Sequence, residues 1–217
     1  MSEPTPLVVS TRNPNKITEL RALLGGLQLQ LVTAASCGVP EVEETADTLA
    51  GNAALKARAA FFHTGLPSLA DDTGLCVAAL NGAPGVHSAR FSGPDATYEK
   101  NRNLLLERMQ DVDDADRGAV FVTCLALVVP ASSGLVEEEG MEEVVCADGT
   151  RGLLTWVEGR AEGRILRVPR GPGSFGYDPL FFYPPLDKTF AELTREEKNA
   201  VSHRGRAYRA LRERLNP

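Results

Sequence analysis

The sequence has no long hydrophobic run and no excess of basic residues, and each absence excludes a class of protein. No stretch of the 217 residues approaches the roughly 20 consecutive apolar residues of a membrane-spanning helix, so we expect no membrane association. There are 23 Lys and Arg residues against 29 Asp and Glu, a formal net charge of −6. A nucleic-acid polymer is therefore not an expected partner. A single nucleotide in a locally basic pocket remains compatible with this charge.

Cysteine and histidine are also scarce. Three histidines in the whole chain make a zinc site an unfavoured interpretation. The cysteines are scattered without a Cys-x-x-Cys pair, which favours reduced thiols in a cytoplasmic protein; they are Cys37, Cys76, Cys124 and Cys146. The first six residues are polar and have no basic segment followed by an apolar run, so they do not resemble a targeting sequence.

Alternating apolar patterns predict a mixed α/β fold in a single domain spanning 1–217. Apolar, β-rich runs predict strands at 7–10, 29–33, 119–129, 144–147 and 153–157. Helical spacing predicts helices at 14–24, 48–62, 96–109 and 194–215, the first with Asn13 as its N-cap. The acidic segment 132–140 is interpreted as a solvated turn between strands, and the Gly- and Pro-rich segment 170–185 as a loop.

The first candidate site is the segment 11–16, Thr-Arg-Asn-Pro-Asn-Lys. A strand there runs into a polar turn and then into a helix start, which points backbone N–H groups and the positive end of the helix at one spot. That arrangement suits a phosphate, and Lys16 adds a flexible positive charge. The glycines of a Walker A loop are absent, and an ordinary capped helix with a surface lysine is the alternative.

Asp71 and Asp72 form the second candidate site. They lie between the apolar runs 66–70 and 75–80, and we place them at the end of a strand. Carboxylates in an apolar context need a partner, because burying them unpaired is costly. A hard cation with oxygen ligands is the natural partner, and Mg²⁺ with phosphate is its commonest setting. A turn with two solvated aspartates is the alternative.

A glycine-rich segment near the C-terminus matches the pattern G-x-G-x-x-G over 171–176. The dinucleotide-binding motif requires a helix directly behind the glycines, and the prolines that follow prevent one. The segment is therefore either a tight loop or a loop that brings its backbone and Phe175 close to a planar ligand.

Arg204 occupies an unusual position for a charged residue, because it falls on the apolar face of the predicted last helix. Its position falls within about 20° of the middle of an apolar stripe at helical spacing, formed by Ala200, Ala207, Leu211 and Leu215. A guanidinium on this inward face either pairs with an internal carboxylate or reaches a ligand. His203 and Lys198 flank it.

Taken together, these segments resemble one family. Residues 10–19 match T-x-N-x-x-K-x-x-E, and Glu43-Glu44-Thr45 with Asn52-Ala53 match E-E-T-G-x-T-F-x-x-N-A. The remaining matches are 70–75 (A-D-D-S-G-L), 82–91 (G-x-P-G-x-x-S-A-R-Y), 175–179 (Phe-Gly-Tyr-Asp-Pro) and 198–204, which contains Lys-Asn and Ser-His-Arg. The chain is similar to the inosine/xanthosine triphosphate pyrophosphatases, the RdgB-type or ITPA-like family, from about residue 7 to residue 213.

The resemblance implies a long mixed sheet, two lobes that are not independent, an active-site cleft between them, and usually a homodimer. It also implies the reaction, in which dITP, ITP or XTP and water give the monophosphate and pyrophosphate. Asp72 matches the general base, and Glu43 with Asp72 the ligands of Mg²⁺. The implied substrate contacts are Thr11, Arg12, Asn13, Pro14, Asn15, Lys16, Thr73, Phe175, Gly176, Tyr177, Asp178, Lys198, His203 and Arg204.

Four departures from the family pattern matter. Arg12 and Thr73 replace a common glycine and serine, Ala46 replaces glycine, and Leu49 replaces phenylalanine. Thr73 keeps the hydroxyl group, whereas Arg12 either tightens phosphate binding or narrows the cleft. Two other functions stay open: a pyrophosphatase for modified pyrimidine or methylated nucleotides, and a non-catalytic nucleotide sensor. A base beside the metal argues against the sensor, because binding alone does not require one.

Overall fold

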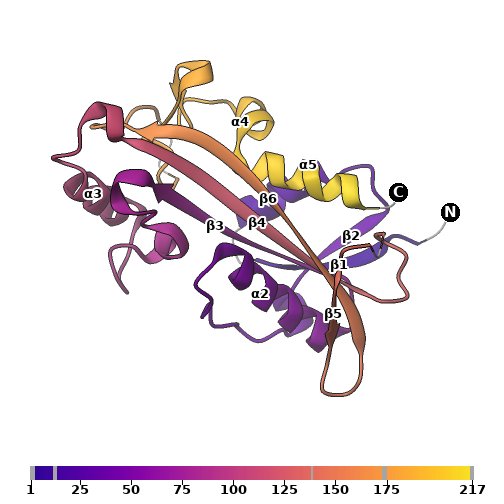
Figure 1. Ribbon diagram of the computed structural model, residues 1–217. Helices are drawn as coiled ribbons and strands as arrows, with labels where there is room; N and C mark the ends of the chain where they lie inside the picture. Colours follow the sequence, from indigo (N-terminus) through magenta and orange to yellow (C-terminus); the bar gives the residue numbers. More distant parts are fainter. Residues whose placement is uncertain (1–2, 12–13, 138, 173–174, 216–217) are drawn as a thin grey trace. The chain divides into compact units, whose positions relative to one another are not determined.

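The computed structural model describes residues 3–11, 14–137, 139–172 and 175–215 (Figure 1), and within the first helix the side chains at 14, 15, 19, 22 and 23 lie outside this description. Over the described residues the fold is mixed α/β. It has an eight-stranded sheet with the order β2-β1-β3-β4-β6-β7-β8, and β5 pairs with β6. The mixed α/β class with a long central sheet is therefore confirmed.

Parallel and antiparallel pairing both occur in this sheet. β1 pairs in parallel with β2 and β3, whereas β6 pairs antiparallel with β5 and β7, and β7 with β8. The strands are β1 (Thr5–Ser10), β2 (Leu29–Thr33), β3 (Ser68–Val77), β4 (Gly118–Pro130), β5 (Glu142–Val145), β6 (Arg151–Ile165), β7 (Phe181–Tyr183) and β8 (Lys188–Thr189). The α-helices are α1 (Pro14–Leu23), α2 (Leu49–Thr64), α3 (Tyr98–Arg108), α4 (Arg195–Val201) and α5 (His203–Arg214).

The predicted elements mostly agree with the observed ones, but two strand assignments were wrong. Asp71 and Asp72 do not end a strand, because β3 continues through them to Val77. Residues 68–70 and 75–77 of the two flanking apolar runs belong to this one strand. Neighbouring strands supply backbone hydrogen bonds that a local pattern cannot indicate. The segment 170–185 is not loop throughout, since it contains β7, whose three residues are all buried.

Two further predictions need correction. The last helix is two helices, because Ser202 has φ −70° and ψ 158° and interrupts the helix between α4 and α5. The segment 132–140 is not simply a solvated turn: Val136 is only 6% exposed and forms a β-bridge with Leu215. Val136 belongs to the core cluster, and Leu135 packs against it, so apolar side chains connect this acidic segment to the core.

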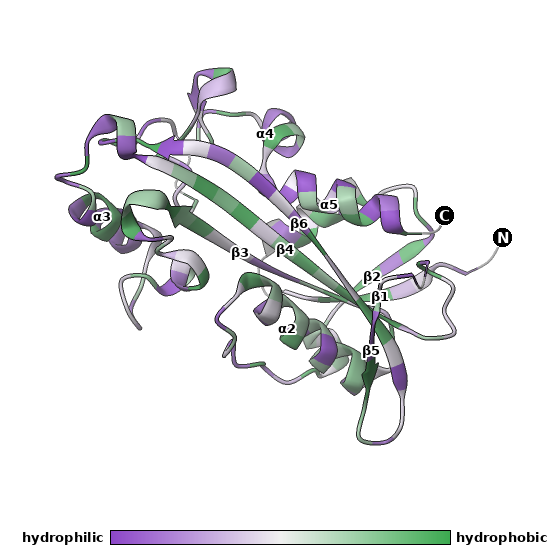
Figure 2. Cartoon of the chain, in the orientation of Figure 1, coloured by the Kyte–Doolittle hydropathy of each residue, from purple (hydrophilic) through white to green (hydrophobic). Residues whose placement is uncertain are grey.

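The chain divides into two compact units, which we describe separately. The first unit comprises Met1–Asp72, Cys124–Glu158 and Ala207–Pro217, and the second comprises Thr73–Thr123 and Gly159–Arg206. β3, β4 and β6 each contribute residues to both units. Figure 2 shows β4 as hydrophobic along most of its length, which is the pattern of a strand buried on both faces.

The core of the first unit lies on both faces of its part of the sheet. Alternate residues of β1 and β4 pack with α1 and α5 in one cluster, which includes Leu7, Val9, Leu20, Leu125, Leu127, Ala207 and Leu211. α2 covers the opposite face and buries Ala53, Ala57, Ala60 and Phe61 completely (Figure 1). The small alanines let this helix approach the strands closely, which brings the polar side chains of α2 to β3.

The core of the second unit is rich in aromatic side chains. Phe121, Phe181 and Phe190 contact one another, with ring centroids 4.7 Å apart for the Phe121–Phe181 and Phe181–Phe190 pairs. The His203 ring stacks on Phe121 at 4.6 Å. The buried Arg117, 3% exposed, donates to the carbonyl oxygens of Ile165 and Met109 at 2.8 and 2.7 Å. This guanidinium satisfies carbonyl groups at the ends of α3 and β6.

Gly163 in β6 allows the close approach of β7. A Cβ atom at this position would meet the carbonyl oxygen of Phe182 and, at 2.7 Å, the ring of Phe181. We expect Gly163→Ala to lower the free energy of unfolding by about 1–3 kcal/mol, because backbone and core must shift. Gly118→Ala in β4 is the control, since its Cβ would meet no described atom within 4 Å. Equal urea midpoints for the two variants would contradict this packing.

Candidate functional site

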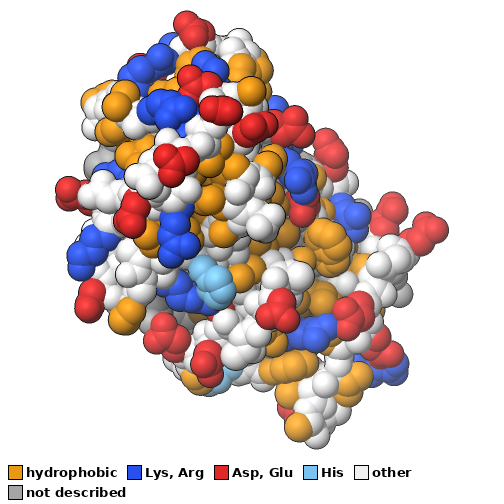
Figure 3. Space-filling view, turned by 60° about the vertical axis from the view of Figure 1, so that its left-hand side comes forward, with side chains coloured by type: hydrophobic (Ala, Val, Ile, Leu, Met, Phe, Trp, Pro, Cys, Tyr) orange, Lys and Arg blue, Asp and Glu red, His pale blue; other side chains and the backbone are white. Residues whose placement is uncertain are grey.

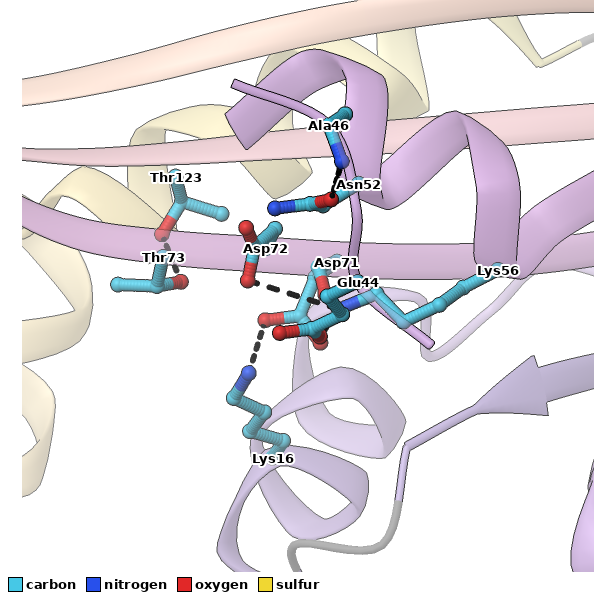
Figure 4. Close-up of polar contacts among 9 residues, drawn as sticks. All are labelled: Lys16, Glu44, Ala46, Asn52, Lys56, Asp71, Asp72, Thr73 and Thr123. Carbon is cyan, nitrogen blue, oxygen red and sulfur yellow. Dashed lines mark hydrogen bonds and ion pairs between the residues drawn. The ribbon is translucent and has the colours of Figure 1, made fainter. Parts of the chain in front are cut away.

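Lys56 joins three acidic residues of the first unit. Its Nζ lies 2.7 Å from Glu44 Oε1, 2.7 Å from the carbonyl oxygen of Asp71 and 3.5 Å from Asp72 Oδ1. Figure 4 shows this side chain reaching from α2 to β3. The lysine is largely buried, so its charge is poorly screened by water and holds the carboxylates together.

The local sequence explains how α2 presents these groups. Thr48 caps the helix by accepting a hydrogen bond from the backbone N–H of Gly51 at 3.0 Å. Asn52 and Lys56 are four residues apart and therefore lie on the same side of α2. Asn52 is fully buried, and its Oδ1 accepts from the backbone N–H of Ala46 at 2.9 Å. This bond fixes the segment that carries Glu44 beside the helix.

Asp72 lies in a poorly hydrated environment. Burial raises the pKa of its carboxyl group, Lys56 lowers it and Glu44 raises it, and the net pKa is above the ordinary value. Its Oδ2 is buried and makes no hydrogen bond within the described part of the chain. Burial lowers the pKa of Lys56, but the nearby carboxylates, led by Asp72, outweigh this and raise the net value. The lysine therefore remains charged, and an oxygen of Asp72 remains available.

Asp71 has a different partner. Its Oδ2 lies 2.5 Å from Lys16 Nζ, and the side chains are 5% and 18% exposed respectively. Lys16, the last residue of the predicted phosphate segment, thus approaches the acidic group from the first turn of α1. Thr11 directly follows β1. Arg12 and Asn13 lie outside the described residues, as do the side chains of Pro14 and Asn15.

The structure brings Glu44, and not Glu43, to Lys56. Exposure alternates along 41–47, with the even positions half-buried and Glu43 exposed. Val42 and Ala46 are apolar, and this alternation was a signal in the sequence that Glu44 points inward. Lys56 was not predicted either, although it lies in an Ala-rich helix segment, one turn after the buried Asn52. Its partners come from distant segments, which local spacing does not reveal.

The second group of predicted residues lies in the second unit. Lys198 forms an ion pair with Asp178, and its Nζ lies 5.5 Å from the centroid of the Phe175 ring. Tyr177 is 5% exposed and donates to the carbonyl oxygen of Ser88 at 2.9 Å. Burial raises its pKa, so it is a neutral part of the core. Thr73 Oγ1 lies 2.7 Å from Thr123 Oγ1.

His203 and Arg204 begin α5 and are almost fully buried, with exposures of 4% and 5%. The prediction that Arg204 faces inward is therefore confirmed. The interruption at Ser202 removes Ala200 from the stripe on which this prediction partly depended. The remaining members support it, since Ala207 and Leu211 are 0% and 1% exposed. His203 is held as a stacked ring on Phe121.

The two neighbouring aspartates should respond oppositely to neutralisation. The raised pKa of Asp72 means that ionisation disfavours the folded state, so stability is lost as pH rises through that pKa. At pH 7.5 in the presence of a chelator, we expect the melting temperature of Asp72→Asn to equal or exceed that of the wild type. In acid the two melting temperatures should converge, because the wild-type carboxyl group is then neutral as well. Asp71→Asn leaves Lys16 without its buried partner and should cost at least about 1 kcal/mol. Calorimetric scans in which both variants lose stability equally would contradict this contrast.

Comparison with known proteins gives consistent matches. The chain is 47% identical over 210 residues to a dITP/XTP pyrophosphatase of Streptomyces coelicolor, with 95% of each protein covered. It is 45% identical over 209 residues to a dITP/XTP pyrophosphatase of Escherichia coli K12, with 96% of this chain and 97% of the relative covered.

Solved structures agree with this result. A HAM1 protein from Coxiella burnetii superposes with a TM-score of 0.80 at 40% identity, covering 95% of this chain and 96% of that one. A nucleoside-triphosphatase / dITP/XTP pyrophosphatase from Mycobacterium abscessus gives a TM-score of 0.69 at 44% identity, with 95% and 98% covered. A family model described as the Ham1 family matches residues 7–214. With nearly its whole length matched by family, relatives and structures, the chain belongs to the Ham1 family.

Proposed function

We propose that the protein hydrolyses dITP, ITP and XTP to the corresponding monophosphate and pyrophosphate, and so removes deaminated purine nucleotides. One observation carries the proposal. The partly buried Asp72, with a raised pKa and an unbonded Oδ2, lies beside Lys56 in a chain similar to dITP/XTP pyrophosphatases over nearly its full length. Burial of the ionised carboxylate costs stability, which Lys56 offsets only in part. A catalytic role would explain why the carboxylate is there.

The acidic group around Lys56 suits a Mg²⁺ ion that the protein and the substrate coordinate together. Within the described ranges no three His, Cys, Asp or Glu side chains form a cluster that could hold a metal ion unaided. Mg²⁺ commonly binds through only one or two carboxylates, completing its octahedron with water and substrate phosphate oxygens. Oδ2 of Asp72 makes no hydrogen bond in the described structure, and Glu44 contacts the same lysine, Lys56. We therefore assign the ion to Asp72 together with Glu44, whereas the family resemblance implies Asp72 together with Glu43. When bound, it would neutralise phosphate charge.

Asp72 is the proposed general base. In the metal-free protein, burial raises its pKa, which favours acceptance of a proton. A water oxygen attacks the α-phosphorus while its proton passes to Asp72, and the bond from the α-phosphorus to the bridging oxygen breaks. Pyrophosphate leaves with that oxygen, and the proton on Asp72 then returns to solvent. Lys56 supplies positive charge beside the base, and Lys16 supplies it near the helix start.

Base recognition is assigned to the second unit. Phe175 offers an aromatic ring and the buried Arg204 offers N–H donors. A 6-oxo purine presents an acceptor where adenine presents an amino group. Fixed donors are left unpaired when adenine enters, and such a loss supports large discrimination.

The partner is a free nucleotide and not a polymer. On the face shown in Figure 3, basic side chains are interspersed with acidic ones. Among the described residues no helix is both long and apolar enough to cross a membrane. The four cysteines all lie within the described ranges, and none of them forms a disulfide there. We extend the proposal to a cytoplasmic homodimer, which analytical ultracentrifugation tests for its oligomeric part.

Pyrophosphate release across a panel of nucleotides tests the proposed function. We expect turnover of dITP, ITP and XTP at least about a hundredfold faster than that of ATP, because adenine leaves the fixed donors unpaired; GTP and dUTP complete the panel. Chelation of Mg²⁺ should abolish it. Asp72→Asn should lose nearly all turnover and still bind dITP. Preferred hydrolysis of dUTP would favour a pyrimidine enzyme, whereas binding without any hydrolysis would favour a sensor.

Arg204→Ala tests base recognition. The change should remove one charge-assisted hydrogen bond to the 6-oxo group, worth about 1.5–3 kcal/mol. The ratio of kcat/KM for ITP to that for ATP should therefore fall by about tenfold or more. A merely structural Arg204 would instead lower the melting temperature and reduce both rates in proportion. Arg204→Lys keeps the charge, loses the planar donors and serves as the second variant.

A further inference from the structure

The start of α3 faces the segment that carries Phe175. Tyr98 and Arg102 are four residues apart and lie on the same side of the helix. The Tyr98 ring meets the Phe175 ring edge-on, with centroids 5.2 Å apart and an interplanar angle of 62°. Arg102 Nη1 donates to the carbonyl oxygen of Gly176 at 2.8 Å. One helix face thus contacts both the ring and the backbone of this segment.

The helix start is itself firmly fixed. Asn101, 2% exposed, accepts hydrogen bonds from the backbone N–H and the hydroxyl of Ser92 at 2.8 and 2.7 Å. Its amide donates to the carbonyl oxygens of Ser88 and Ala89 at 3.3 and 3.0 Å. Tyr177 donates to the same carbonyl of Ser88. The carbonyl group of Ser88 therefore anchors both α3, through Asn101, and the residues after Phe175, through Tyr177.

Gly176 makes the orientation of this segment dependent on outside support. Its φ is +52°, in the left-handed region that glycine adopts readily. A backbone with this freedom does not hold its own carbonyl in one direction, whereas a bond from a charged guanidinium does. The Phe175 ring is contacted by Tyr98 and by Lys198 Nζ at 5.5 Å. Tyr98 contributes an aromatic contact that remains 47% exposed and therefore adds little to the core.

We propose that Tyr98 and Arg102 are positioning residues that hold the Phe175 ring ready to stack on the nucleobase. The inference rests on the proposed function, because it assigns a partner to the ring. Neither residue carries chemistry on the triphosphate. Holding the ring in its binding orientation lowers the ordering cost of binding, so their loss weakens nucleotide affinity and leaves the hydrolytic step unchanged.

The test is Tyr98→Ala, with Tyr98→Phe as the matched control that keeps the ring. The lost aromatic contact should raise the KM for dITP about three- to tenfold with kcat within twofold. Tyr98→Phe should stay near wild type. The melting temperature of both should be unchanged, since the side chain is half exposed. An unchanged KM in Tyr98→Ala would overturn the proposal. A variant that loses both kcat and melting temperature would also overturn it.

A double-mutant cycle shows whether the effect passes through Phe175. In a Phe175→Ala background, Tyr98→Ala should raise KM no further, because the ring that it positions is gone. Additive increases would overturn the proposal. Arg102→Leu should raise KM in the same way, and Arg102→Lys should restore part of it.

Failure of the proposed function would be visible separately, in the wild-type protein. It would release no pyrophosphate from any purine nucleoside triphosphate. The affinity of wild type and Tyr98→Ala for dIMP, measured by titration calorimetry, would then decide the positioning role without turnover. A weaker affinity in the variant supports it, and equal affinities overturn it.

Discussion

The buried ammonium group of Lys56 is the interaction on which the acidic site depends. β3 carries two adjacent carboxylates through the interior of the protein, where an uncompensated charge is costly. Lys56 contacts Glu44, Asp72 and the backbone of Asp71, and Lys16 pairs with Asp71 from another helix. Two cations thus balance three acidic side chains. One oxygen of Asp72 is left without a hydrogen bond in the described structure, and that oxygen is the one we assign to Mg²⁺.

The apolar surroundings of this site set its chemistry. α2 approaches the strands through alanines, and its Asn52 and Lys56 replace what would otherwise be core side chains. The same burial that raises the pKa of Asp72 disfavours its ionised form and so lowers the free energy of unfolding at neutral pH. The rest of the fold must compensate for this loss of stability. The large core around it, with α1 and α5 on one face and α2 on the other, supplies that stability.

In the second unit, the aromatic core and the predicted base-contacting residues form one continuous structure. His203 stacks on Phe121, Tyr177 is buried and tied to Ser88, and Lys198 joins Asp178 to the ring of Phe175. Rings and hydrogen bonds with defined directions restrict side-chain motion more than aliphatic packing does. In our proposal, nucleotide affinity also depends on residues such as Tyr98, which contacts Phe175.

Local sequence determined the strands and helices with strong periodicity, the inward face of Arg204, and the family, whose motifs are contiguous. The site assignments of Asp72 and of the segments around Lys16 and Phe175 came from the same motifs and remain predictions. Only the tertiary structure decided that Glu44 and not Glu43 meets Lys56, that β3 continues through the aspartates, that Ser202 divides the last helix, and that Tyr98 contacts Phe175. Except for the break at Ser202, each of these depends on contacts between segments that are not neighbours in the chain. Periodicity records which face of an element is buried, whereas the partner that it meets there is set by packing.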